Sequence, residues 1–204
     1  MIYKYLTLAV SAALLLAGCD EKWNNAPGQS GQEIRLNAEI QAMTKVSEMA
    51  FDEADRIGVF VTEYDGDFAT ELAVSGNYAD NRLFTYTGNA LTTEEGLYYP
   101  VINNVDIYGY HPYRETVESV TAFPFRVATD QREEAALKGS DFVWAKRANV
   151  AANSSVVDLG FSHLLSTVEV RVDAGNGISS LEGMTVTLRN VACEGTIDLR
   201  TGQT

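Results

Sequence analysis

The sequence contains few cysteines and few histidines, and this scarcity limits the chemistry that the chain can support. It has two residues of each kind among 204, too few for the clustered ligands of a structural or catalytic metal site. His111 and His163 lie in strand-like stretches beside aromatic residues, so we interpret both as structural. The sequence also lacks a G-x-S-x-G nucleophile elbow and a G-x-x-x-x-G-K-S/T phosphate loop. We therefore predict a protein that is not an enzyme and that binds no metal ion or cofactor.

Basic residues are also scarce, with 15 lysines and arginines against 28 aspartates and glutamates. The resulting net charge of -13 gives a surface that repels nucleic acid and anionic lipid headgroups. We therefore exclude nucleic acid as a partner. Any contact with a membrane has to come from a covalently attached lipid.

Long apolar runs are missing, apart from one short run at the N-terminus. A basic start at Lys4 leads into Leu6–Leu16, which is about half of the ~20 residues that a membrane span needs. The run closes with Leu16-Ala17-Gly18-Cys19, where the small residues before the cysteine suit a signal peptidase. This pattern is typical of a bacterial lipoprotein signal, and it predicts lipid attachment at Cys19. The alternative is an ordinary secretory signal in which the cysteine occurs by chance.

Composition divides the chain into three predicted parts. Residues 1–18 form the signal peptide, and residues 19–32 form the lipidated cysteine and a flexible tether rich in proline, glycine and serine. Residues 33–204 are long enough for one domain with a substantial core. Once Cys19 carries lipid, only Cys193 remains, which excludes an internal disulfide. We interpret Cys193 as a small buried residue on a strand.

Alternation of apolar and polar residues indicates that the domain is all-β. In Glu33–Ile40, every second residue is apolar, which is the pattern of a half-buried strand. The other predicted strands are Ile57–Val61, Leu83–Thr87, Leu97–Tyr99, Val105–Tyr113, Phe142–Ala145, Val156–Phe161, Leu165–Val172, Thr185–Arg189 and Gly195–Leu199. Short turns rich in glycine, asparagine and aspartate separate them, which favours a β-sandwich or barrel. Gln131–Lys138 is at most a short helix within a connection.

Tyrosine is frequent, with ten residues, and several of them cluster between residues 98 and 113. Aromatic side chains on a surface stack on sugar rings or anchor a partner protein. On alternating strands they more often pack a core or an edge. Tyr98, Tyr108 and Tyr110 are therefore candidate ligand contacts, with packing as the favoured interpretation.

Several segments, taken in order, match the pattern of a known family. They are Thr44-Lys45 with Phe51–Val61, Asp106–Tyr113, Asp141–Ala145, Leu159–Val168 and Leu188–Leu199. In these segments the chain resembles the fimbrillin-like (Mfa-like) pilins and surface lipoproteins of anaerobic gut and oral bacteria. The resemblance implies a transthyretin-like antiparallel β-sandwich, with residues 33–204 as its N-terminal domain. The family continues beyond the position of Thr204, so a second domain is expected to be missing.

The resemblance also implies a location and a mode of assembly. Asp20-Glu21 resembles the acidic signal that sends such lipoproteins to the outer face of the outer membrane, and assembled subunits form a fimbrium. A protease trims the N-terminal strand, and a donor strand from another pilin subunit fills the groove that is left. Here Glu33–Ile40 is the removable strand and Gln41–Met49 is the loop that is cut, with Lys45 at the position where the family often has arginine.

The predicted function is therefore a lipid-anchored pilus subunit or pilus-associated adhesin that assembles by strand exchange. The alternative is a monomeric cell-surface lipoprotein that binds a glycan or another ligand on a host or bacterial surface. The tyrosines between residues 98 and 113 would form its contact surface. Neither function requires a cofactor.

Overall fold

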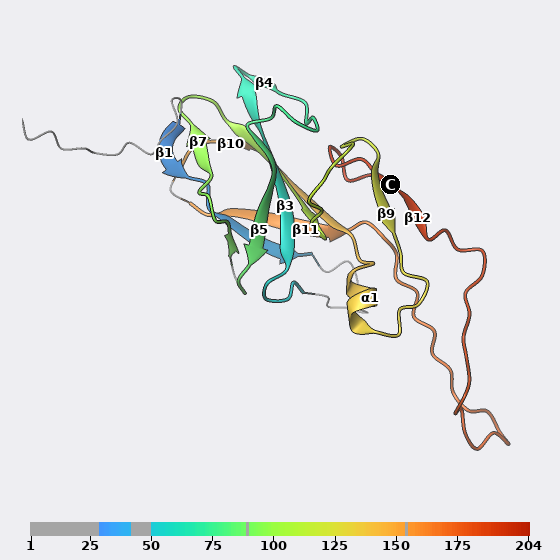
Figure 1. Cartoon of the computed structure of the whole chain (residues 1–204). Helices are drawn as coiled ribbons and strands as arrows, with labels where there is room; N and C mark the ends of the chain where they lie inside the picture. The colour runs from blue at the N-terminus through green and yellow to red at the C-terminus, as the bar shows by residue number, and fades with distance from the viewer. Residues whose placement is uncertain (1–28, 42–49, 89, 154) are drawn as a thin grey trace, which may run out of the picture.

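The computed structural model describes residues 29–41, 50–88, 90–153 and 155–204, so Cys19 and Lys45 lie outside the described residues. Nearly all of its regular structure is β (Figure 1). The strands are β1 (Gln29–Glu33), β2 (Leu36–Ile40), β3 (Arg56–Asp65), β4 (Phe68–Ala69), β5 (Ala79–Tyr86), β6 (Leu91–Thr92), β7 (Tyr98–Pro100), β8 (Val105–His111), β9 (Phe123–Arg126), β10 (Val143–Val150), β11 (Val157–His163) and β12 (Glu194–Ile197). These elements confirm the predicted all-β fold class.

The main sheet closes on itself. Its strand order is β4-β3-β5-β6-β2-β11-β10-β8, and a further pairing of β3 with β8 joins its two ends. The result is a β-sandwich whose layers are continuous along their edges, as in a flattened barrel. All strand pairs are antiparallel except β2 with β11, which run parallel. This pair joins residues about 120 positions apart, and no local pattern in the sequence indicates it.

Two hydrophobic cores lie on opposite faces of β8, because successive side chains of a strand point to opposite faces. Val105 and Ile107 belong to the inner core, to which β2, β3, β5, β10 and β11 also contribute. Tyr108 and Tyr110 belong to an outer core, which includes Phe123 and the C-terminal residues Ile197 and Leu199. Strand β8 is therefore covered on both faces, and its first six residues are buried.

The C-terminal residues are fixed to the body over the outer core. Strand β12 pairs with β9 in a separate two-stranded sheet. Beyond it, the Leu199 N–H donates to the Val120 carbonyl at 2.7 Å, and the Trp144 indole N–H donates to the Leu199 carbonyl at 2.8 Å. Ile197 and Leu199 thus close the outer core, although β12 ends at Ile197, two residues before the end of the predicted strand Gly195–Leu199.

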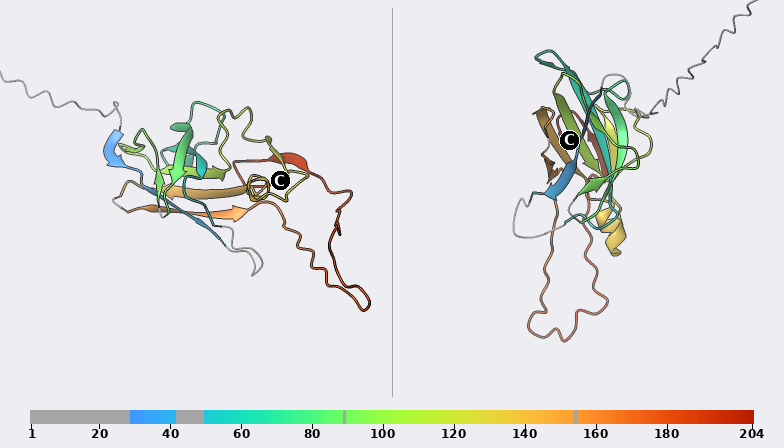
Figure 2. Two further views of the ribbon diagram at one scale, coloured as in Figure 1. Left: turned by 60° about the horizontal axis from the view of Figure 1, so that its bottom comes forward. Right: turned by 90° about the vertical axis from the view of Figure 1, so that its left-hand side faces the viewer.

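The segment between β11 and β12 differs from the prediction. Leu165–Val172 and Thr185–Arg189 were predicted as strands, but the structure assigns no strand there. Residues 166–192 instead form an exposed arm that extends far from the body (Figures 1 and 2). The reason is that alternation alone does not make a strand; a hydrogen-bonding neighbour is also needed, and this arm has none among the described residues. The prediction for Cys193 was also wrong, since it is half-buried and precedes β12.

The N-terminal strand also departs from the predicted boundaries. Strand β1 begins at Gln29, within the predicted tether, and pairs with β7. Its glycine, serine and glutamine residues carry no strand signal, so this pairing comes from the tertiary context. The predicted strand Glu33–Ile40 is divided, because the Ile34 N–H turns to the Leu97 carbonyl at 2.7 Å.

Helical structure is minor. The helix α1 (Glu134–Lys138) is shorter than the predicted segment and none of its residues is buried. Among the described residues, no helix is long and apolar enough to cross a membrane.

Candidate functional site

Strand β2 and the groove beneath it form the principal candidate site. The alternation seen in the sequence places Leu36 and Ala38 in the inner core, together with Ile34 just before the strand. Glu39 on the other face is exposed. The strand is thus an amphipathic cover whose apolar side fills the barrel.

The backbone of β2 is held mainly along one side. It pairs with β11 over its whole length, from Leu36 opposite Val157 to Ile40 opposite Phe161. Just beyond its C-terminal end, the Gln41 N–H donates to the Phe161 carbonyl at 2.7 Å. On its other side β2 meets the short strand β6 at one residue pair, Leu36 opposite Leu91. Loss of β2 would therefore leave the backbone of one complete edge of β11 unpaired, and only one residue pair with β6 would be lost besides.

The groove floor consists of the apolar face of β11 and its neighbours. Val157, Leu159 and Phe161 are all buried in the inner core. Phe161 packs edge-on against Phe51 with ring centroids 5.1 Å apart. It also lies directly over Gly109, where an added Cβ would come within 2.6 Å of its ring. Without β2, this floor would present apolar pockets beside unpaired backbone groups, which is the arrangement that an extended peptide fills.

Asn37 is a weak point within β2. Its side-chain amide donates to Asp158 Oδ1 at 3.2 Å. Its own Oδ1 is buried and has no hydrogen-bond partner among the described residues. A buried acceptor without a partner costs about 1–3 kcal/mol. The native strand therefore fits its groove less well than a strand with a better matched residue at this position.

The three candidate tyrosines differ in burial. Tyr108 and Tyr110 are buried in the outer core, with 5% and 1% exposed. Tyr98 is half-buried on β7 and belongs to neither core. Both faces of β8 are covered, so Tyr108 and Tyr110 serve packing, which was the favoured interpretation of their sequence pattern.

Tyr110 occupies the centre of the outer core. Its ring stacks on Phe142 with centroids 6.0 Å apart, and its hydroxyl donates to Asn81 Oδ1 at 2.7 Å. Burial disfavours the ionised phenol and raises the pKa of Tyr110 to about 12. The group is thus a neutral structural phenol at all physiological pH values.

One buried carboxylate, Asp106, lies beside Tyr108. Burial opposes its charge, but a hydrogen bond from the Asn149 N–H at 2.8 Å and the Lys146 ammonium at 3.0 Å outweigh burial and lower the pKa of Asp106. Lys146 also lies over the Tyr108 ring, 4.7 Å from its centroid. The cluster ties β8 to β10 through paired charges and hydrogen bonds, so we interpret it as structural.

Both histidines have structural partners. His163 Nδ1 is 2.8 Å from Asp141 Oδ1, and His111 Nδ1 is 3.0 Å from the Arg56 carbonyl oxygen. Within the described parts of the chain, no group of three or more histidine, cysteine, aspartate or glutamate residues could hold a metal ion.

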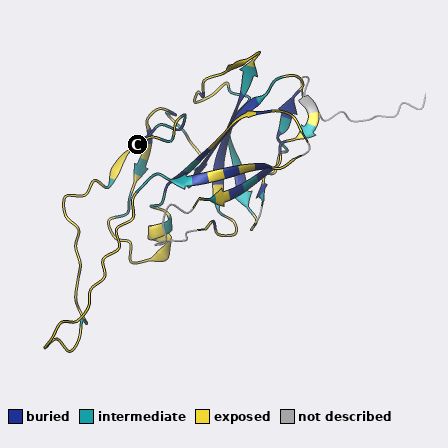
Figure 3. Ribbon diagram, turned by 180° about the vertical axis from the view of Figure 1, so that it is seen from behind, coloured by how far each residue is buried: buried dark blue, intermediate teal, exposed yellow. Residues whose placement is uncertain are grey.

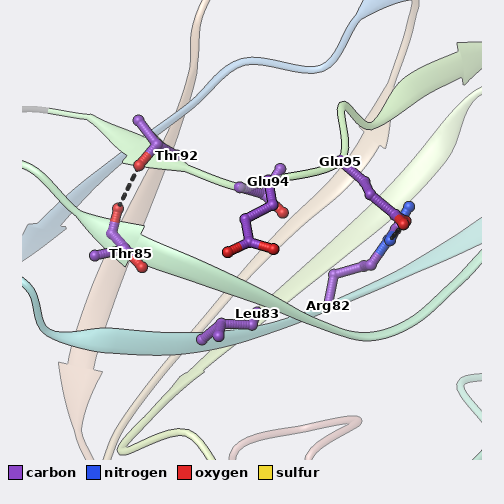
Figure 4. A pocket seen from close by; sticks show the side chains of 7 residues that line it. Arg82, Leu83, Thr85, Thr92, Glu94 and Glu95 are labelled. Atoms are coloured by element: carbon purple, nitrogen blue, oxygen red, sulfur yellow. Dashed lines mark hydrogen bonds and ion pairs between the residues drawn. The ribbon is translucent and has the colours of Figure 1, made fainter.

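Sequence reasoning missed a polar hollow between β5 and the segment that follows β6 (Figure 4). Its lining residues are Arg82, Leu83, Thr85, Thr92, Thr93, Glu94 and Glu95. Thr92 Oγ1 donates to the Thr85 carbonyl at 3.3 Å, and Arg82 forms an ion pair with Glu95. No motif marks these residues, because the hollow forms only when the two segments pair.

Known proteins match this chain over most of its described residues. A family model described as fimbrillin-like matches residues 44–204. A search of curated proteins finds no significant match. The chain is similar to the crystal structure of a candidate cell adhesion protein from Bacteroides ovatus, with 21% identity and a TM-score of 0.59, covering 84% of this chain and 66% of that one.

Two further crystal structures are more distant. A candidate cell adhesion protein from Bacteroides uniformis has 24% identity and a TM-score of 0.45, covering 65% of this chain and 47% of that one. A fimbrial protein from Bacteroides ovatus has 16% identity and a TM-score of 0.43, covering 66% and 28%. The chain therefore spans less than two thirds of the length of each of these three proteins.

Proposed function

The chain belongs to the fimbrillin-like family, and from this premise we propose that it is a lipid-anchored pilus subunit or pilus-associated adhesin that assembles by strand exchange. Membership of a fimbrial family indicates a protein of the cell surface that associates with other pilin subunits. The finer elements of the proposal are the lipid on Cys19, the cut at Lys45 and the exchange of β2.

The position of β2 is the observation that carries this proposal. The strand fills the inner core with Ile34, Leu36 and Ala38, yet its backbone is paired extensively only with β11. It is also the first element of the main sheet in chain order, so a single cut after it separates it from the rest of the domain. An element with these properties can leave and be replaced without unfolding the other strands.

Exchange follows physically from what the departure of β2 exposes. Apolar side chains of the groove floor meet water, at a cost of about 25 cal/mol per Å² of apolar surface. The freed edge of β11 also leaves its backbone groups without protein partners. A strand from a neighbouring subunit satisfies both, and a residue that fits better than Asn37 would make the exchange favourable.

The lipid gives the process an order. Until the cut occurs, the segment that contains β2 connects Cys19 to the folded domain, so the subunit stays on the membrane. The cut at Lys45 leaves β2 held only by non-covalent contacts, and its departure then releases the domain and opens the groove. Anchoring and assembly are thus mutually exclusive states of the same molecule.

Incubating the full chain with a trypsin-like protease tests the proposal. We expect cleavage at Lys45, loss of the β2 fragment and a ladder of oligomers on a native gel, in the presence of a subunit able to donate a strand. Retention of the β2 fragment on the cut domain, with no ladder, would overturn strand exchange for this chain.

A matched pair of variants isolates the cut. Lys45→Gln removes the proposed site, whereas Lys22→Gln removes a basic site upstream of β2 and leaves Lys45 intact. Oligomers should disappear in the first variant and persist in the second. Equal ladders from both would place the essential cut elsewhere.

A second candidate function is supported by the hollow shown in Figure 4. Its hydroxyl, carboxylate and guanidinium groups are those that bind sugar hydroxyls, and they would allow a monomeric lipoprotein to bind a glycan. A glycan array would test this, with Thr93→Val and Glu94→Gln expected to abolish binding. Binding that survives both changes but is lost in Tyr98→Ala would show that the glycan binds at the tyrosines and not in this hollow.

A further inference from the structure

The exposed arm is held to the body at both ends, and between these ends no backbone hydrogen bond joins it to any other described part of the chain. At its start, the Leu164 N–H donates to the Phe142 carbonyl at 2.9 Å, and at its end the Val127 N–H donates to the Cys193 carbonyl at 2.7 Å. Figure 3 shows that nearly all of the arm is exposed, in contrast to the strands of the body. It is therefore a fixed projection rather than a free terminus.

Both halves of the arm carry an apolar stripe. Val168, Val170 and Val172 alternate with charged residues and are 64%, 50% and 41% exposed. In the returning half, Met184, Val186 and Leu188 alternate with threonines and are exposed to a similar extent. Apolar stripes at period two suit a paired strand, the three valines above all because they are β-branched, and soluble proteins rarely leave large apolar patches uncovered.

The backbone of the arm makes few hydrogen bonds to other described residues. Among the described residues, the only backbone hydrogen bonds within the arm close two turns, Ile178 to Gly175 and Met184 to Leu181, each at 3.1 Å. No such bond joins its two halves, which stand apart in Figure 2. Unpaired edges of this kind act as templates for another strand.

We propose that residues 167–173 pair in antiparallel orientation with the same residues of a second copy of this chain, with the twofold axis at Val170. In this register Val168 lies opposite Val172 of the second copy, and Glu169 lies opposite Arg171. All apolar side chains then share one face and all charged side chains the other. The pairing uses one patch on both copies, as a twofold interface requires.

The charged residues favour this register over the two adjacent registers. Moving the axis to Arg171 would place two arginines opposite each other and Glu169 opposite Asp173. An axis at Glu169 would place two glutamates opposite each other. Like charges directly opposite one another destabilise a strand pair, whereas opposite charges stabilise it. Within one chain Glu169 and Arg171 already form an ion pair at 2.7 Å, and the same groups face each other across the proposed axis.

The interface is small. Two strands of about seven residues bury less surface than the ~1,200 Å² of a stable complex. We therefore expect a weak dimer in solution that becomes populated when copies are concentrated side by side, for example on one membrane. This contact is separate from the β2 groove and requires neither trimming nor strand exchange.

Disulfide trapping in the full chain, with Cys19 and Cys193 changed to serine, tests the proposal. Val170→Cys places two thiols opposite each other on the axis, and Val186→Cys is the matched control in the other half of the arm. We expect covalent dimers to form about tenfold faster with Cys at 170, because the proposed register brings these positions together. Equal rates would overturn the register, and a faster reaction at 186 would assign the contact to the returning half.

A charge exchange distinguishes specific pairing from random collision. In the Val170→Cys background, Glu169→Arg alone and Arg171→Glu alone each create like-charged pairs and should slow trapping about tenfold. A mixture of the two variants restores both opposite-charge pairs, and mixed dimers should form at the original rate. A mixture that stays slow, or single variants that react normally, would refute pairing around Val170. These changes lie on exposed residues, so folding is unaffected.

Discussion

Tyr110 stabilises the outer core as a neutral phenol, and this gives the protein an alkaline limit. Burial raises its pKa from 10.0 to about 12 in the folded state. Its contribution to stability is complete below pH 10, where both states are protonated. Between pH 10 and about 12 only the unfolded state loses the proton, so the free energy of unfolding should fall by about 3 kcal/mol. Urea denaturation at a series of pH values measures this decline.

The control for this prediction is Tyr110→Phe. It keeps the ring that stacks on Phe142 but removes the ionisable group and the bond to Asn81. The variant should be less stable than the parent at pH 8, yet its stability should decline less between pH 10 and 12. An unchanged alkaline slope would mean that another group controls it.

Asn37 leads to a second prediction, because its buried Oδ1 has no hydrogen-bond partner in the described parts of the chain. Asn37→Val removes the buried acceptor and adds a β-branched side chain within β2, so the free energy of unfolding should rise by about 1 kcal/mol. Because the native strand then fits better, protease-triggered oligomers should also appear more slowly. A more stable variant that oligomerises at the parent rate would show that the fit of β2 in its groove does not control the rate of assembly.

Strand β2 contributes to the domain chiefly through the side chains that it buries. Leu36 is buried while Glu39 on the opposite face is exposed. Leu36→Ala should lower the free energy of unfolding by about 2–4 kcal/mol. Glu39→Ala should change it by less than about 0.5 kcal/mol, as is usual for surface positions. Chemical denaturation followed by Trp144 fluorescence provides the measurement, and similar losses in both variants would contradict the role assigned to β2.

Strand β2 and the exposed arm show the limit of what sequence patterns can predict. Leu36–Ile40 and Val168–Val172 alternate equally well, and both were predicted as strands. The first is a strand because β11 supplies hydrogen bonds and the inner core receives its side chains. The second has no such neighbour among the described residues. Alternation shows that a segment is able to form a strand, whereas a hydrogen-bonding neighbour determines whether the strand forms.

The same limit applied to the candidate site. Alternation identified the apolar face of β2 from the sequence alone, and the resemblance to fimbrillin-like proteins implied the hypothesis that the strand is removable. Neither could indicate that β2 runs parallel to β11, because that pairing joins distant segments. Alternation favoured packing for Tyr108, but it could not indicate that residues 197 and 199 near the C-terminus supply part of its cover.

At the scale of the whole molecule, the two cores share strands β3 and β8, which pair with each other. Phe60 on β3 belongs to the outer core, whereas Val59 and Val61 belong to the inner core. The backbone hydrogen bonds of the β3–β8 pair do not involve β2, which lies on the other side of the ring. This separation explains how a domain could lose its first strand and keep its fold.

The acidic surface leads to a final prediction about membrane attachment. A net charge of -13 repels anionic headgroups, so the folded domain itself should have no affinity for the bilayer. Cys19→Ser should therefore move the protein from the membrane fraction to the soluble fraction of a cell extract. Cys193→Ser is the matched control, because that cysteine lies in the folded domain and should leave attachment unchanged. If the Cys19→Ser protein still sedimented with membranes and bound anionic vesicles, attachment would have to come from the protein surface, and the proposed release by a single cut would fail with it.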